Sequence, residues 1–244
     1  MRRAQGFTLI ELSLAMTFVS ILLISIAMLS IQLTNQYSRG MTLKEVAQAG
    51  TEVSNDIKRT MVQSQLSGAG VRTKAISGGG TVLCTNSYSY IANNPANLEA
   101  DNGNVIRVGG SGSPVAVRLA KVRDSNGTLC STPSQLDTTK TYVTTDFTEL
   151  LAGGSRKLVV REMTAVPSGL SLDGNGVPNG GLFYQEYQKG RAIYTVRLTI
   201  GTGVESELAS NTSCRAPKDL QSNLEFCAID TFEFTTRVGS SNRQ

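Results

Sequence analysis

The chain has no histidine and no tryptophan among its 244 residues. Without histidine it cannot build a Ser-His-Asp or Cys-His catalytic arrangement, and metal sites that depend on imidazole are excluded as well. The acidic residues beyond the first 66 positions are scattered, with no pair at a spacing typical of acid-base catalysis. The glycines at 78–80 are not followed by the lysine and serine of a phosphate-binding loop. We therefore predict that the protein is not an enzyme and uses no cofactor.

Proline is absent from the first 94 residues, and charge is nearly absent from residues 7–33, where Glu11 is the only charged side chain. About 20 predominantly apolar residues are enough for a helix to cross a bilayer, so residues 7–31 are predicted to form a transmembrane segment. Arg2 and Arg3 precede this segment, and positive residues stay on the cytoplasmic side. The sequence therefore predicts a single-pass protein of the cytoplasmic membrane with its N-terminus inside.

Glu11 lies within this apolar segment, where an ionised carboxylate is costly by roughly 2.5 kcal/mol or more. Such a charge either has a partner or belongs to a functional site. The alternative, a plain single-pass anchor, gains nothing from it. The six residues before the segment are basic and end in Gly6. A cut after Gly6 would leave the apolar segment on the mature chain, whereas an ordinary secretory signal loses its apolar core.

The run Gly6-Phe7-Thr8-Leu9-Ile10-Glu11-Leu12 resembles the prepilin signature of type IV pilins and of the pseudopilins of type II secretion and DNA-uptake systems. The resemblance implies cleavage after Gly6 by a prepilin peptidase, N-methylation of Phe7 and a role for Glu11 in filament assembly. The implied partners are other pilin subunits, the peptidase, and an inner-membrane assembly platform with an extension ATPase. In the filament, the positive N-terminus of one subunit is expected to neutralise Glu11 of a neighbour. The resemblance also implies that the mature protein, once assembled, lies at the cell surface.

One long helix is predicted from residue 7 to about residue 66. Beyond the membrane segment, apolar or small residues recur every three or four positions, as on the buried face of an amphipathic helix. They are Leu43, Val46, Gly50, Val53, Ile57 and Met61. Many type IV pilins carry a glycine and a proline in the apolar half, and this chain has neither between Phe7 and Arg39. The helix is therefore either continuous or loosened at residues 34–40, and Gly68 and Gly70 are its predicted stops.

The remaining residues, 67–244, are rich in glycine, serine, threonine and asparagine around short apolar runs, which is typical of β-structure. Residues 191–200 alternate apolar and polar side chains and are predicted to form a hairpin with residues 183–187. Further strands are predicted at 104–108, 115–122, 141–145, 157–163 and 231–238. The predicted fold class is α+β and type IV pilin-like. It comprises a leader peptide (1–6), an N-terminal helix (7–66) and a β-rich globular head (67–244), which has the size of one domain.

Four cysteines, Cys84, Cys130, Cys214 and Cys227, lie in the part of the chain predicted to be exported, and an even number there indicates disulfides. The sequence alone leaves three connectivities open. A metal site is the rival use, but no C-x-x-C spacing and no histidine are present, so none is predicted. The resemblance to pilins implies a C-terminal disulfide loop between Cys214 and Cys227 and, with it, a bond between Cys84 and Cys130.

The kind of subunit is open. The length of the chain and residues 51–59, which resemble an Asp-Ile-Arg pattern of larger minor pilins and pseudopilins, favour a minor, tip-associated or initiating subunit over a major pilin. The alternatives are a filament-delivered adhesin that binds a surface ligand, and a pseudopilin of a secretion or DNA-uptake system. DNA is a further candidate partner, since four basic residues suit phosphates, although such residues also protect a solvated strand edge. They are Arg107, Arg118, Lys121 and Arg123.

Overall fold

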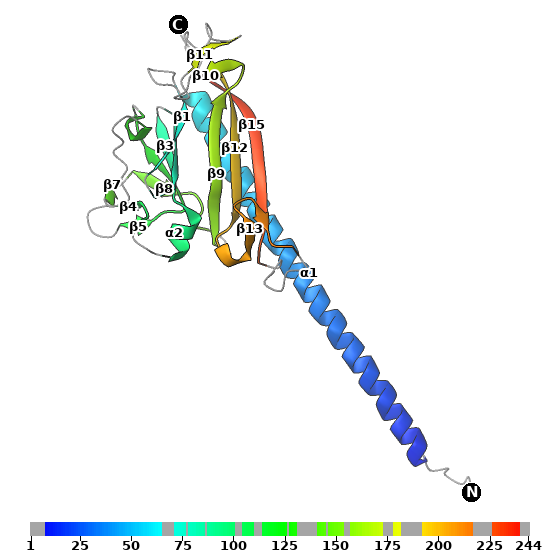
Figure 1. Cartoon of the computed structure of the whole chain (residues 1–244). Coiled ribbons are helices and arrows are strands. Elements are labelled where there is room, and N and C mark those ends of the chain that lie inside the picture. The colour runs from blue at the N-terminus through cyan, green and yellow to red at the C-terminus, as the bar shows by residue number, and fades with distance from the viewer. Residues whose placement is uncertain are drawn as a thin grey trace.

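The computed structural model describes residues 8–64, 71–76, 78–85, 87–100, 104–109, 114–125, 127–130, 141–144, 146–153, 157–172, 178–181, 192–216 and 226–239. One long helix leads into a head built mainly of antiparallel β-sheets, and the N-terminus lies at the end of the helix that is remote from the head (Figure 1). An α+β architecture is therefore confirmed. The predicted leader and Phe7 lie outside the described residues.

The N-terminal helix, α1 (Leu9–Gln63), is continuous over 55 residues. At about 1.5 Å per residue it is ~80 Å long. The alternative of a loosened segment at residues 34–40 is wrong, because those residues are helical throughout. The absence of proline explains the continuity, since proline is the residue that most strongly breaks a helix interior. The helix ends at Gln63, three residues earlier than predicted, and the predicted stops Gly68 and Gly70 lie outside the described residues.

The C-terminal half of α1 packs on the head, and most of the predicted stripe is buried there. The buried residues are Thr42, Val46, Gly50, Val53, Ser54, Ile57, Thr60 and Met61. Leu43 was predicted in this stripe, and that is wrong, because its side chain is 47% exposed. Thr42 is buried in its place. Its hydroxyl donates to the Ser38 carbonyl at 3.0 Å, so the buried Thr42 hydroxyl has a partner.

A three-stranded antiparallel sheet lies along α1 in the order β15 (Ile229–Val238), β12 (Ala192–Thr202), β9 (Leu158–Pro167). Tyr194, Val196, Leu198 and Ile200 of β12 are buried on one face, as predicted from their alternation. Residues 183–187, the predicted hairpin partner, lie outside the described residues. Both edges of β12 are instead occupied, by β15 and β9. Strand β15 runs beside α1 (Figure 1) and is the strand with which the helix makes its most extensive contact.

The second sheet has five antiparallel strands. In spatial order they are β1 (Arg72–Ala75), β2 (Thr81–Cys84), β3 (Tyr88–Ala92), β6 (Leu119–Arg123) and β8 (Phe147–Glu149). The strand predicted at residues 115–122 is in fact two strands, β5 (Val115–Ala116) and β6, which belong to different sheets. Strand β5 pairs with β4 (Arg107–Gly109), which also pairs in parallel with β7 (Thr141–Val143).

Two short hairpins and three helical turns complete the described part of the head. Strands β10 (Leu170–Leu172) and β11 (Pro178–Gly181) form one hairpin, and β13 (Leu208–Ser210) and β14 (Ser213–Cys214) form another. The described helical turns are α2 (Pro95–Ala100), η1 (Thr128–Cys130) and η2 (Glu205–Glu207).

Two apolar cores result from this arrangement. The larger is enclosed by α1, the three-stranded sheet and one face of the five-stranded sheet, to which β2, β3 and β6 contribute Leu83, Tyr90 and Leu119. The smaller lies on the opposite face of the five-stranded sheet, where Val82, Ile91 and Val122 meet side chains from β4 and η1. The five-stranded sheet is therefore covered on both faces, and it connects the helix side of the head to its far side.

Candidate assembly site

The first turn of α1 contains Glu11, the carboxylate predicted to act in assembly. Thr8 is the N-cap residue, and its backbone N–H and its hydroxyl both donate to Glu11 Oε2 at 2.9 Å. The Glu11 backbone N–H donates in return to Thr8 Oγ1 at 3.3 Å. This reciprocal arrangement is a capping box, which satisfies two of the N–H groups that a helix start leaves without partners. Within the single chain, Glu11 therefore already has a partner. The Thr-x-x-Glu spacing at residues 8–11 is the sequence signal for it.

The N-terminal half of α1 has an exposed apolar surface on every side. Every large apolar side chain from residue 9 to residue 33 is exposed: Leu9, Ile10, Leu12, Leu14, Met16, Phe18, Val19, Ile21, Leu22, Leu23, Ile24, Ile26, Met28, Leu29, Ile31 and Leu33. A surface of this size is unfavourable in water, since each such side chain gains roughly 1.5–3 kcal/mol on burial. The segment is long and apolar enough to span a membrane.

The hydroxyl groups in the apolar half are all satisfied within the helix. Ser13 donates to the carbonyl three residues earlier, and five others donate to the carbonyl four residues earlier, at distances of 2.8–3.0 Å. The five are Thr17, Ser20, Ser25, Ser30 and Thr34. Because these groups need no water, they do not prevent the helix from lying in lipid or against other apolar helices.

Further along α1, a polar cluster fixes the helix to the five-stranded sheet. The Tyr90 hydroxyl of β3 lies 2.8 Å from Asp56 Oδ2 and 2.7 Å from Thr60 Oγ1, and the Lys121 ammonium of β6 lies 2.9 Å from Asp56 Oδ1. Lys121 also lies over the Tyr88 ring, 4.6 Å from its centroid. Burial raises the pKa of Tyr90 far above its ordinary value. Asp56 is part of the segment that suggested a minor pilin, and in this structure it joins helix to head.

The basic residues predicted as a candidate DNA surface make contacts within the chain. Lys121 pairs with Asp56, and Arg118 Nη1 donates to the Leu151 carbonyl at 2.8 Å. Arg123 lies 3.8 Å from Asp146 in an exposed pair, and Arg107, on β4, also has an interaction within the chain. These contacts favour a structural role for the four residues over phosphate binding.

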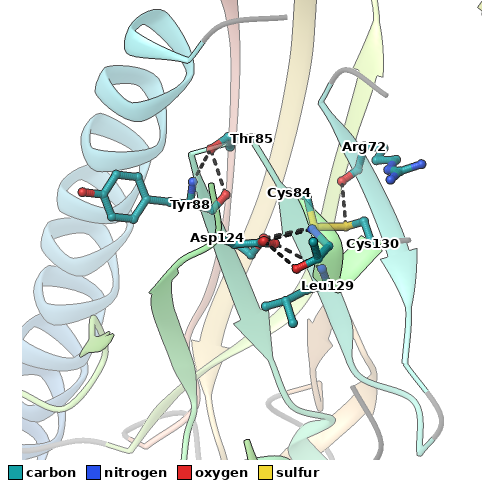
Figure 2. The surroundings of a disulfide bond; sticks show 9 residues. Arg72, Cys84, Thr85, Tyr88, Asp124, Leu129 and Cys130 are labelled. Carbon is teal, nitrogen blue, oxygen red and sulfur yellow. Dashed lines mark hydrogen bonds between the residues drawn. A yellow bond between two sulfur atoms is a disulfide. The ribbon is translucent and has the colours of Figure 1, made fainter. Parts of the chain in front are cut away.

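The Cys84–Cys130 disulfide joins β2 to η1, with a Cα–Cα distance of 6.2 Å. A buried carboxylate, Asp124, organises the turn that contains Cys130, and Figure 2 shows its hydrogen bonds beside the disulfide. Asp124 accepts hydrogen bonds from the backbone N–H groups of Thr128 and Leu129 at 2.9 and 3.1 Å, and from the Ser89 hydroxyl at 2.7 Å. These bonds link the turn that contains Cys130 to Ser89 of β3 independently of the sulfur-sulfur bond.

The Cys214–Cys227 disulfide joins β14 to the residues just before β15, with a Cα–Cα distance of 5.9 Å. Both pairings are those that the resemblance to pilins implies. Among the described residues, no group of three or more histidine, cysteine, aspartate or glutamate side chains could hold a metal ion. The predicted processing residues, Gly6 and Phe7, lie outside the described residues, which begin at Thr8.

Comparisons with protein-family models, with curated proteins and with solved structures give no match to this chain. Three features therefore carry the functional assignment. They are the prepilin-like sequence run, the geometry of α1 and the way in which the head is attached to it.

Proposed function

We propose that this protein is a structural subunit of a type IV pilus or related pseudopilus. A prepilin peptidase cleaves it after Gly6, and it polymerises through α1. The observation that supports this most directly is the division of one uninterrupted helix into two halves. The first half is exposed and apolar and contains the single carboxylate Glu11, and the second half is buried against the head. Such a helix has one half available for lipid or for other copies while the other half carries a folded domain.

The apolar half occupies two environments in this proposal. Before assembly it spans the cytoplasmic membrane, and after assembly the same surface packs against the helices of other subunits in a filament outside the cell. Glu11 changes its partner between the two states. It is capped by Thr8 in the single chain, and in the filament it pairs with the positive N-terminus of Phe7 of a neighbouring subunit.

The processing step is tested by mass spectrometry of the native protein. The expected mature chain begins at Phe7, bears an N-terminal methyl group and lacks Arg2 and Arg3. Gly6→Val is expected to leave full-length protein in the membrane, because a branched side chain replaces hydrogen at the cleavage site. Ala4→Val, which makes a similar change two residues before Gly6, should be processed normally. A native chain that retains Arg2 and Arg3 contradicts the proposal.

Within the filament we propose a minor, tip-associated or initiating subunit. The length of the chain and its resemblance to larger minor pilins at residues 51–59 support this assignment. Quantitative mass spectrometry of sheared filaments should find far fewer copies of this chain than of a shorter pilin. If antibody against this chain labelled the whole length of the filament, and if its copy number were close to that of the shorter pilin, the minor assignment would be overturned. Membership of the filament would still stand.

A further inference from the structure

The exposed face of α1 beside the head carries opposite charges on its two flanks. Residues seven apart lie two turns apart on nearly the same line of a helix, so Glu45 and Glu52 share one line, which continues to Arg59. Lys44 and Lys58, fourteen residues apart, lie close to another line. The Lys58 ammonium lies over the Phe234 ring, 5.1 Å from its centroid, which places the lysine line on the β15 side of the helix. The glutamate line faces the loop that comes after β8.

A hollow of about 260 Å³ lies on the glutamate side of the helix. Glu45, Gln48, Ala49 and Glu52 line it from α1, and Leu150 and Leu151 are among the residues that line it from the head. It therefore combines an apolar surface with an exposed carboxylate, that of Glu52, whereas Glu45 already has an interaction within the chain. A lysine side chain has the complementary chemistry, an aliphatic stem with a cationic end. Among the described residues, neither Lys44 nor Glu52 takes part in an ion pair.

The spacing of charges along α1 defines a register between parallel copies. If the Phe7 amine of one copy lies at the level of Glu11 of the next, the two helices are displaced by four residues, or ~6 Å. The same displacement brings Lys44 of the first copy to the level of Gln48 of the second. Gln48 comes between Glu45 and Glu52 along the helix and also lines the hollow. Because α1 is continuous, a displacement set at its N-terminus is transmitted to the head (Figure 1).

We infer that the hollow is the docking site for Lys44 of a second copy of this chain. The inference rests on the proposed function, since it requires parallel copies joined through α1. The lysine line of one copy meets the glutamate line of the next, so the contact joins two different surfaces. A contact of this type does not close into a dimer and can continue along a filament. Opposite charges on the two surfaces favour the staggered register over one that brings like charges together.

The test uses the full-length chain as the only copy of its gene in the cell and measures incorporation into sheared filaments by immunoblot. Lys44→Glu and Glu52→Lys each place like charges at the contact and are expected to lower incorporation by about tenfold. The chain that carries both changes restores opposite charges between copies and is expected to recover most of the incorporation. Arg59→Glu is the matched control, because Arg59 continues the glutamate line but is not among the residues that line the hollow, so reversal of its charge should have little effect.

A zero-length carbodiimide, which couples amines to carboxylates, tests the contact directly. In wild-type filaments it should give a covalent dimer in which Lys44 is joined to Glu52, identified by peptide mass spectrometry. Lys44→Arg keeps the positive charge but cannot be coupled, so it should enter filaments normally and give no such dimer. Normal incorporation of Lys44→Glu, or failure of the double variant to recover, overturns the inference while wild-type incorporation still supports the proposed function. Absence of the wild-type chain from filaments contradicts both.

Discussion

The ring of Phe232 lies against the backbone of Gly50, so closely that a Cβ atom on Gly50 would come within 1.9 Å of the ring. Gly50 is in the C-terminal half of α1 and Phe232 is on β15, and these two elements make the main contact between helix and head. Glycine in a helix interior costs about 1 kcal/mol relative to alanine. Its presence at this position allows the strand to approach the helix.

Gly50→Ala is therefore expected to destabilise the protein by ~1–3 kcal/mol, because displacement of the ring outweighs the gain in helix propensity. Gly40→Ala provides the matched control in the same helix. No atom lies within 4 Å of a Cβ at Gly40, so that change should be neutral or stabilising by up to ~1 kcal/mol. Thermal unfolding of the full-length protein in detergent measures both. An equal effect of the two substitutions would show that Phe232 does not constrain Gly50.

Asp56→Ala is expected to lower the free energy of unfolding by ~1–3 kcal/mol, since it leaves the partly buried Lys121 and the buried Tyr90 hydroxyl without their carboxylate. Asp146→Ala is the control. It removes the acid of an exposed pair with Arg123 at 3.8 Å, and exposed pairs contribute only ~0–1 kcal/mol. Denaturant unfolding measures the loss of free energy of unfolding in each variant. A loss for Asp56→Ala no larger than that for Asp146→Ala would contradict the proposed role of the polar cluster.

Glu149 predicts a pH dependence of stability. Its carboxylate accepts the backbone N–H of Leu119 at 2.9 Å, but burial, the larger effect, raises its pKa above the ordinary value of 4.5. The folded state therefore holds the proton more tightly than the unfolded state. The resulting stabilisation is fully present below about pH 4.5 and is lost as the pH rises through the folded-state pKa.

Glu149→Gln removes this titration while it keeps an acceptor oxygen for the Leu119 N–H. Relative to the wild type, the variant should become progressively more stable as the pH rises from about 4 to 7. Urea unfolding of both proteins across that pH range measures the difference in their free energies of unfolding. The contributions of the other carboxylates are the same in both proteins and cancel in this difference. A difference that does not change with pH would show that burial does not dominate at Glu149.

The two disulfides should differ in their contribution to stability. Cys84 and Cys130 are 46 residues apart and Cys214 and Cys227 are 13 apart. Each disulfide is expected to stabilise the protein by ~3–4 kcal/mol through restriction of the unfolded chain. The bond that closes the longer loop should contribute ~1 kcal/mol more than the other. Replacing both members of each pair with serine should therefore cost more at Cys84 and Cys130. Melting temperatures of the two double variants test this order, and neither change should affect cleavage after Gly6.

Glu11→Leu is expected to leave membrane insertion intact and to abolish entry into filaments. The capping box allows a sharper comparison, because glutamine at the third helical position can also bond to the N-cap backbone N–H. Glu11→Gln should therefore retain the helix start but lose the negative charge. If pairing with the Phe7 amine is the requirement, both variants should fail on immunoblots of sheared filaments. Normal entry of Glu11→Gln would show that capping by Thr8 is what the filament needs.

The sequence predicted the helix and the strands of the three-stranded sheet because those elements face water on one side. Val46, Val53 and Ile57 recur at helical spacing, and β12 alternates apolar and polar residues along most of its length. Strands β2 and β3 were not predicted. Both of their faces are buried, in the two different cores, so their residues show no alternation.

The candidate site was predicted only in part, for a similar physical reason. The isolated charge of Glu11 can be read directly from the sequence. The Thr-x-x-Glu spacing of the capping box can be read there too, although it was not part of the prediction. The contact of Asp56 with Tyr90 and Lys121 joins residues 34 and 65 positions apart. No local pattern indicates such a contact. It arises from the order of the strands in the five-stranded sheet.

The way in which β15 lies along α1 has a mechanical consequence. Strand and helix run side by side, and the buried helix face extends from Thr42 to Met61. A pulling force directed along the helix axis would therefore load these contacts in shear, all at once, and would not peel them apart one at a time. The close fit at Gly50 and the polar cluster at Asp56 both oppose sliding in that direction. A head attached in this way is suited to resist tension applied through its own helix.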